Sequence, residues 1–142
     1  MKYVFDTYAW VEYLEGTSIG KKIEIYFSNP SYQIFTPTIV LAELSDALTK
    51  GNVNKPWEDI IEFVNLHSEK VPISELIASK AGPLKKRLRV SSRGAGIIDA
   101  IILACAEVMG ATLLTGDPDL THQEGVVDIS ALPMHEDGTH KG

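Results

Sequence analysis

Residues 97–117 read IIDAIILACAEVMGATLLTGD, and this stretch decides the fold class. Its first part, Ile97–Met109, is apolar nearly all round, which predicts a buried helix, and Gly110 ends that helix. The residues Ala111–Leu114 follow directly and predict a strand. A buried helix joined to a strand by a short connection is typical of an α/β domain, in which helices cover a sheet.

The rest of the chain continues this alternation. Strands are predicted at 2–5, 32–35, 71–73 and 126–129. Helices are predicted at 8–14, 18–27 and 54–67, from Thr36 to Lys50, and after Ser74. Ser18, Thr36 and Ser74 are the expected N-caps. Pro83 is expected to kink or divide the last of these helices. We therefore expect an α/β protein, a three-layer α/β/α sandwich with a central, mainly parallel sheet. Ligands in such sheets bind beyond the carboxyl ends of the strands.

Length and composition fit one soluble domain. The chain has 142 residues, of which we expect 1–132 to form a single domain and 133–142 a polar, frayed tail. One cysteine, Cys105, excludes an intrachain disulfide and a cysteine-rich zinc site. No apolar run reaches the roughly 18–20 residues of a membrane span, and the start lacks a signal-peptide pattern, so we expect a cytoplasmic protein without a membrane partner.

Charge is unevenly distributed along the chain. The formal net charge is −6, yet residues 76–98 contain no acidic side chain. The basic residues of this segment are Lys80, Lys85, Lys86, Arg87, Arg89 and Arg93. The segment can bind an anion or can form a solvated helix face, and the acidic total excludes a protein that coats nucleic acid through bulk charge.

Four carboxylates occupy positions where a ligand site of this fold is expected. Asp6 and Asp117 follow predicted strands, Glu43 lies early in a helix after a strand, and Asp99 interrupts the apolar helix. Asp119 is a weaker fifth candidate. Each acid alone has a plain structural alternative: a helix cap for Asp6 and Asp99, a turn for Asp117, and a surface position for Glu43. Asp46, one turn after Glu43, is expected on the surface.

The four acids together predict a metal site. If the strands that precede Asp6 and Asp117 are neighbours, the two side chains face each other, and the helices with Glu43 and Asp99 close the ring. Two carboxylates about 4 Å apart repel by about 4 kcal/mol at an effective dielectric near 20, so several together require either that some are protonated or that a cation binds between them. Hard oxygen ligands favour Mg²⁺ or Mn²⁺, which bind phosphate oxygens and lower the pKa of water.

Other conspicuous residues are expected to be structural. The four histidines, His67, His122, His135 and His140, show no zinc-ligand spacing and are predicted on the surface. Cys105, Trp10 and Tyr13 are predicted in the core or, for the two aromatic residues, in an interface. The stretch Ser91–Gly96 is glycine-containing but lacks the P-loop pattern.

Four segments, in this order, resemble the four motifs of PIN-domain ribonucleases. They are VFDT at 4–7, PTIVLAEL at 37–44, IDAIILA at 98–104 and LLTGDPDL at 113–120. The resemblance extends from about Lys2 to Ile129, and the size is similar to that of the single-domain VapC-type toxins of VapBC toxin–antitoxin systems. The chain departs from the family pattern at Leu120, where an aromatic residue is common, and at Gly116, a small residue before Asp117.

The resemblance implies a Mg²⁺- or Mn²⁺-dependent endoribonuclease that hydrolyses single-stranded or loop RNA by metal-activated water, leaving 5′-phosphate and 3′-hydroxyl ends. It implies that Asp6, Glu43, Asp99 and Asp117 bind the metal and are catalytic, and that the hydroxyls of Thr7 and Thr115 support them. Asp119 is expected as a further supporting residue, and the charge of the basic segment predicts that it holds the RNA backbone. The resemblance also implies a homodimer neutralised by a small VapB-like antitoxin whose C-terminal segment lies across the site.

Rival functions fit the sequence less well. A phosphoacceptor receiver domain needs an acidic pair at the first strand and a late lysine, and a haloacid-dehalogenase-like phosphatase needs Asp-x-Asp where this chain has Asp6-Thr7-Tyr8. Two alternatives within the PIN resemblance stay open: an RNA-processing nuclease that is not a toxin, and a non-catalytic scaffold that binds RNA or a protein.

Overall fold

The centre of the molecule is a five-stranded parallel sheet with the strand order β3-β2-β1-β4-β5. The computed structural model describes residues 1–133. The strands are β1 (Lys2–Phe5), β2 (Gln33–Pro37), β3 (Glu69–Val71), β4 (Thr112–Thr115) and β5 (Val126–Asp128). The predicted parallel sheet is confirmed.

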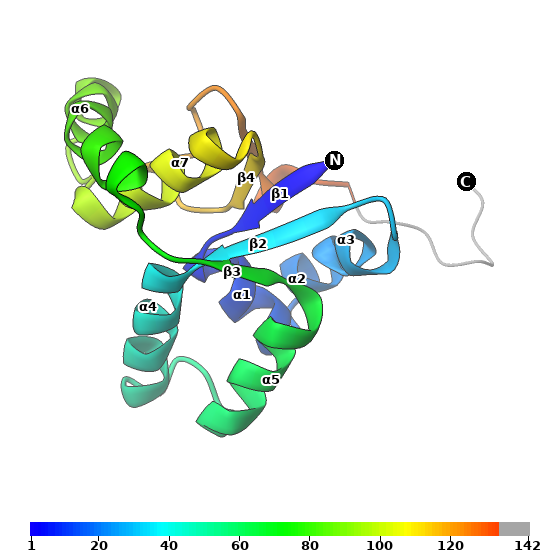
Figure 1. Ribbon diagram of the computed structural model, residues 1–142. Helices are drawn as coiled ribbons and strands as arrows, with labels where there is room; N and C mark the ends of the chain where they lie inside the picture. The colour runs from blue at the N-terminus through cyan, green and yellow to red at the C-terminus, as the bar shows by residue number, and fades with distance from the viewer. Residues whose placement is uncertain (134–142) are drawn as a thin grey trace.

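Helices cover the sheet on two sides. They are α1 (Thr7–Leu14), α2 (Ser18–Ile23), α3 (Ile25–Ser28), α4 (Thr38–Thr49), α5 (Trp57–His67), α6 (Glu75–Ser91) and α7 (Ile97–Met109), followed by the 3₁₀ helix η1 (Ile129–Ala131). Figure 1 shows α6 and α7 on one side of the sheet, and α1, α2, α3 and α5 on the other. The fold is therefore the expected three-layer α/β/α sandwich.

The core is built around β1, which lies between β2 and β4. Val4 pairs with Phe35 on one side and with Leu113 on the other, and it is fully buried. The Phe5 ring packs against the rings of Trp10 and Phe27 at centroid distances of 5.3 and 5.1 Å. A central strand of a parallel sheet is buried on both faces, which explains the apolar run before Asp6.

Local sequence signals set several helix ends as predicted. Ser74 caps α6 by accepting a hydrogen bond from the Ile77 amide at 3.1 Å. Gly110 ends α7 with a φ of 63°, the left-handed conformation that glycine adopts without a steric cost. Asp6 caps α1 by accepting from the Ala9 amide at 2.9 Å.

Two predictions about helices were wrong, and a third was wrong in part. Thr36 does not cap α4; it is a buried residue of β2, and α4 begins after Pro37. The helix predicted at 18–27 is two short helices, and its cap is Thr17, which accepts from the Gly20 amide. Pro83 does not divide α6, which is continuous from Glu75 to Ser91.

The structure also locates the residues expected to be structural. Cys105 and Trp10 are buried, as predicted. The prediction for His67 was wrong: it is partly buried, its ring packs against Phe27 at 4.5 Å, and burial lowers its pKa. His122 is exposed, whereas His135, His140 and the predicted tail after Pro133 lie outside the described residues. No helix within residues 1–133 is long and apolar enough to cross a membrane.

Candidate metal centre

Strand order brings the predicted acids together at the carboxyl edge of the sheet. Phe5 of β1 pairs with Leu114 of β4, so Asp6 and Asp117, which follow these strands, leave the sheet side by side. The helix α4 follows β2, the other neighbour of β1, and presents Glu43. Asp99 lies in the first turn of α7, which packs on β1 and β4.

Asp6 is the most deeply buried acid of the group, with 4% of its surface exposed. One carboxylate oxygen, Oδ1, accepts from the Ala9 amide, and the other, Oδ2, accepts from the hydroxyl of Thr115. Burial raises the pKa of Asp6 to about 7; these two hydrogen bonds oppose the rise, and repulsion by Asp117 and Glu43 adds to it. The surroundings of Asp6 therefore disfavour its negatively charged form.

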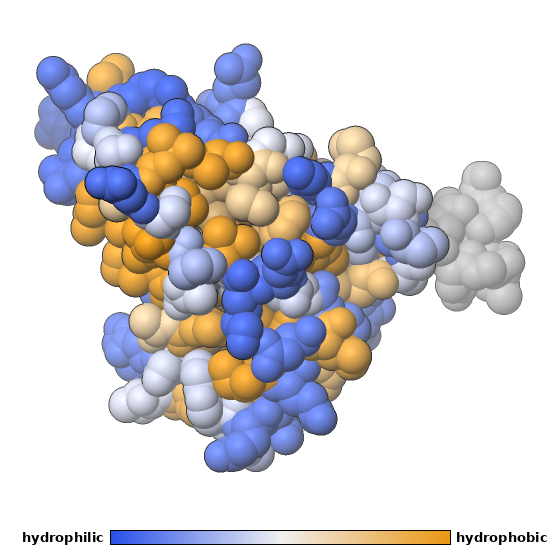
Figure 2. Space-filling view, in the orientation of Figure 1, coloured by the Kyte–Doolittle hydropathy of each residue, from blue (hydrophilic) through white to orange (hydrophobic). Residues whose placement is uncertain are grey.

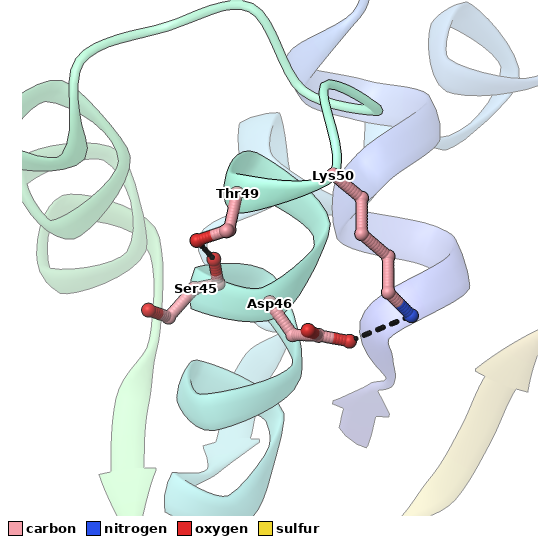
Figure 3. A network of polar contacts seen from close by, with 4 residues as sticks. All are labelled: Ser45, Asp46, Thr49 and Lys50. Carbon is pink, nitrogen blue, oxygen red and sulfur yellow. Dashed lines mark hydrogen bonds and ion pairs between the residues drawn. The ribbon is translucent and has the colours of Figure 1, made fainter.

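Glu43 is partly buried and receives a hydrogen bond from the hydroxyl of Thr7. Burial raises its pKa, and repulsion by Asp99 and Asp117 raises it further. Asp46, on the same helix, is in a different environment: it is exposed and forms an ion pair with Lys50 at 2.9 Å (Figure 3). Glu43 and Asp46 are thus one turn apart on α4, but only Glu43 belongs to the cluster, and Asp46 is an ordinary surface acid.

Asp99, Asp117 and Asp119 form the tightest part of the cluster. One carboxylate oxygen from each lies within 4.8 Å of the other two. Asp99 accepts from the Gly96 amide at 3.0 Å and Asp117 from the Asp119 amide at 2.9 Å. Burial raises the pKa of Asp99, with repulsion by Asp117 and Asp119 as a further cause. Asp119 is therefore closer to the centre of the cluster than its weak sequence signal indicated.

The hydroxyl of Ser92 is a contact that sequence reasoning missed. Ser92 follows α6 and donates a hydrogen bond to the carboxylate of Asp119. The stretch around it, Ser91–Gly96, lacks the P-loop pattern and contains no other recognised motif. No local signal pairs Ser92 with Asp119, because the two residues are 27 positions apart and belong to different loops, one after α6 and one after β4.

The acids of this cluster are Asp6, Glu43, Asp99, Asp117 and Asp119, and we call it the acidic centre. Within residues 1–133 no lysine or arginine forms an ion pair with any of them; the ion pairs found are Lys50–Asp46 and Arg87–Glu107. Partly buried carboxylates that repel each other and have no cationic partner bind a divalent cation favourably. The donor set consists only of oxygens, which fits Mg²⁺ or Mn²⁺.

The predicted RNA-binding residues lie on α6 and on the loop that follows it, and they differ in environment. Arg87 forms an ion pair with Glu107 at 3.0 Å, and Arg89 Nε donates to the Ala95 carbonyl at 2.7 Å. The others are at least partly exposed: Lys80, Lys85, Lys86 and Arg93. The C-terminal end of α6 lies next to the acidic centre, because Ser92 contacts Asp119.

Fold and site together define a class: a three-layer α/β protein with a cluster of acids at the carboxyl edge of a parallel sheet. Comparison with known families identifies the class more closely. The family model of the PIN domain matches residues 3–125, and the chain belongs to this family. The resemblance seen in the four sequence motifs is confirmed.

Solved structures with the same fold include several toxin–antitoxin proteins. A toxin–antitoxin complex from Klebsiella pneumoniae has a TM-score of 0.69 and 23% identity, covering 89% of this chain and 97% of that one. VapBC2 from Rickettsia felis, bound to a promoter DNA fragment, has a TM-score of 0.65 and 22% identity over 89% and 96% of the chains. The sarcin–ricin loop cleaving toxin VapC20 from Mycobacterium tuberculosis has a TM-score of 0.67 and 15% identity over 89% and 97%. No curated protein matches by sequence.

Proposed function

We propose that this protein is a Mg²⁺- or Mn²⁺-dependent endoribonuclease and the toxin of a toxin–antitoxin pair. The observation that carries the proposal is the acidic centre at the carboxyl edge of the sheet. None of its five carboxylates has a lysine or arginine partner within residues 1–133. Membership of the PIN domain family supports a nuclease. The basic surface of α6 supports an RNA substrate, and the cytoplasmic location rests on the sequence prediction alone.

Each acid has a role in this proposal. Asp6, Glu43, Asp99 and Asp117 would hold the ion, with Asp119 as a further ligand or as a support for Asp117. Of these acids, Asp99, Asp117 and Asp119 have oxygens within 4.8 Å of one another, and Asp6 and Glu43 lie outside that group of three. When bound, the ion lowers the pKa of water and stabilises negative charge on a phosphodiester. The hydroxyls of Thr7 and Thr115 keep Glu43 and Asp6 in place through the hydrogen bonds described above.

The acidic centre is tested by RNA cleavage with Mn²⁺ or Mg²⁺ and with EDTA. We expect Asp99→Asn to reduce cleavage by at least about 100-fold, because removal of one charged ligand weakens metal binding. The fold survives, since an asparagine oxygen can still accept from the Gly96 amide. Asp46→Asn is the matched control, because Asp46 is exposed and paired with Lys50. Cleavage by Asp99→Asn at the parental rate, or cleavage that EDTA does not stop, contradicts the proposal.

The toxin assignment includes a small VapB-like antitoxin and a homodimer. Structural similarity to the Klebsiella pneumoniae toxin–antitoxin complex and to Rickettsia felis VapBC2 supports the first partner. The toxin assignment predicts growth arrest on expression, relieved by the product of an adjacent reading frame. A nuclease that cuts RNA but does not arrest growth fits the processing enzyme instead.

Exposed apolar side chains support the homodimer. Val90 at the end of α6 and Ile97 and Ile98 at the start of α7 are 87%, 47% and 36% exposed. Figure 2 shows apolar residues gathered over this part of the molecule between hydrophilic ones. We expect Val90→Asp to shift the protein from dimer to monomer in sedimentation experiments, whereas Leu66→Asp, at an exposed position of α5, has no effect. A monomeric parent, or a dimeric Val90→Asp variant, contradicts the homodimer.

A further inference from the structure

Gly116, the residue before Asp117, is in contact with the aromatic ring of Tyr8 on α1. A β-carbon built on Gly116 would lie 2.6 Å from Cζ and 2.8 Å from Cδ1 of Tyr8, and closer still to Cε1. Real β-carbons essentially never approach another heavy atom within 3.0 Å, so any other residue at 116 would displace the ring or the backbone.

Backbone conformation does not explain this glycine. The described glycines with positive φ are Gly16, Gly51, Gly110 and Gly125, and Gly116 is not among them. An alanine could therefore adopt the φ of residue 116 without the strain of the left-handed region. The physical reason for glycine at position 116 is therefore the Tyr8 ring, which leaves no room for a β-carbon there.

Both partners of this contact are joined directly to the acidic centre. Tyr8 lies in the first turn of α1, two residues after Asp6, which caps that helix. Gly116 follows Thr115, whose hydroxyl donates to Asp6 and accepts from the Asp117 amide at 3.0 Å. Movement of the Gly116 backbone therefore moves the Asp117 carboxylate.

The Tyr8 ring is partly buried and packs against the turn that carries Asp117. Mg²⁺ and Mn²⁺ need ligands at well-defined positions, so a fixed turn favours their binding.

We propose that Tyr8 and Gly116 form an interlocking pair that positions Asp117 for metal binding. This inference rests on the proposed metal centre and makes Tyr8 a positioning residue. The ring restrains the turn after β4, and the missing side chain at 116 makes room for the ring. The two residues act as one unit, so their substitutions are not additive.

The test is a double-mutant cycle in which Mn²⁺ affinity of the full chain is measured by calorimetry without RNA. We expect Gly116→Ala to weaken Mn²⁺ binding at least tenfold and Tyr8→Ala to weaken it severalfold. In the Tyr8→Ala background, Gly116→Ala causes no further loss, because the added methyl group no longer meets a ring. Tyr8→Phe keeps the parental affinity, since it keeps the ring. Gly82→Ala is the control, because a β-carbon there meets nothing within 4 Å.

Equal losses from Gly116→Ala in both backgrounds overturn the inference, as does parental affinity in the single Gly116→Ala variant or a parent that binds no Mn²⁺. If Gly116→Ala alone does not fold, a folded double variant supports the pair, and an unfolded double variant overturns it. RNA cleavage is measured in parallel. A parent that binds Mn²⁺ with the expected coupling but leaves RNA intact contradicts the nuclease and not the interlocking pair.

Discussion

At the scale of single residues, carboxylates of the acidic centre also hold the backbone. Asp6 caps α1 with one oxygen, Asp99 accepts from the Gly96 amide at the start of α7, and Asp117 accepts from the Asp119 amide. A carboxylate has two oxygens and about four acceptor sites, so one hydrogen bond leaves room for a metal. Helix cap and metal ligand are therefore compatible roles, although the sequence presented them as alternatives.

The pKa of Asp6 predicts how stability depends on pH in EDTA. In the folded chain this pKa is about 7, above its ordinary value of 3.8. Between these values the folded state keeps a proton that the unfolded state releases, so the free energy of unfolding falls as pH rises. One such group accounts for roughly 2 kcal/mol between pH 5 and 7, at about 1.4 kcal/mol per pH unit. Denaturant titrations at several pH values measure this slope.

Asp6→Asn removes the titrating group and keeps an oxygen that can accept from Ala9. We expect this variant to lose most of the fall in stability between pH 5 and 7. Asp46→Asn, at an exposed position, should keep the parental slope. A parental slope in Asp6→Asn would show that another group causes the pH dependence.

At the scale of helices and strands, the sequence predicts an element better than its ends. Gly110 and Ser74 mark ends of α7 and α6 because glycine conformation and serine capping are local effects. Thr36 is a residue type that often caps helices, yet tertiary contacts hold it in β2. Its hydroxyl accepts a hydrogen bond from Trp10 Nε1 at 3.1 Å and is hydrogen-bonded to the Ser68 hydroxyl at 2.8 Å. Partners 26 and 32 residues away leave no local sequence signal.

The environments of the basic residues on α6 predict which ones bind RNA. Lys85 and Lys86 have no acidic partner in the described chain, whereas Arg87 is paired with Glu107 and Arg89 supports the Ala95 carbonyl. Neutralising Lys85 and Lys86 to glutamine should weaken RNA binding and reduce the slope of log affinity against log salt by about 1.4, at about 0.7 per single-strand phosphate contact.

Binding is measured in the Asp99→Asn background so that the RNA stays intact. The control is the double variant of Lys50 and Lys55 to glutamine, which removes the same charge far along the sequence from α6. If both double variants change the slope equally, the effect comes from net charge, and α6 is a solvated face.

At the scale of the whole molecule, strand order turns scattered acids into one centre. Asp6 and Asp117 are more than a hundred residues apart, and they meet only because β4 pairs with β1. The alternation of strands and helices predicts a parallel sheet, but it does not determine which strands are neighbours. The four main acids could be chosen from their positions after strands and in an apolar helix. The closeness of Asp119 to Asp99 depends on packing, so the sequence indicated it only weakly.

A metal that binds only where the chain is folded stabilises the whole molecule. At a free Mn²⁺ concentration a hundred times the dissociation constant, the free energy of unfolding should rise by about 2.7 kcal/mol. Thermal unfolding at increasing Mn²⁺ measures this rise, and EDTA should reverse it. Asp99→Asn should lose most of the stabilisation and Asp46→Asn should keep it, because only Asp99 belongs to the acidic centre. Removing a ligand raises the dissociation constant of the ion and so reduces the stabilisation at a given Mn²⁺ concentration. Equal stabilisation of both variants would therefore mean that the ion binds elsewhere on this acidic protein.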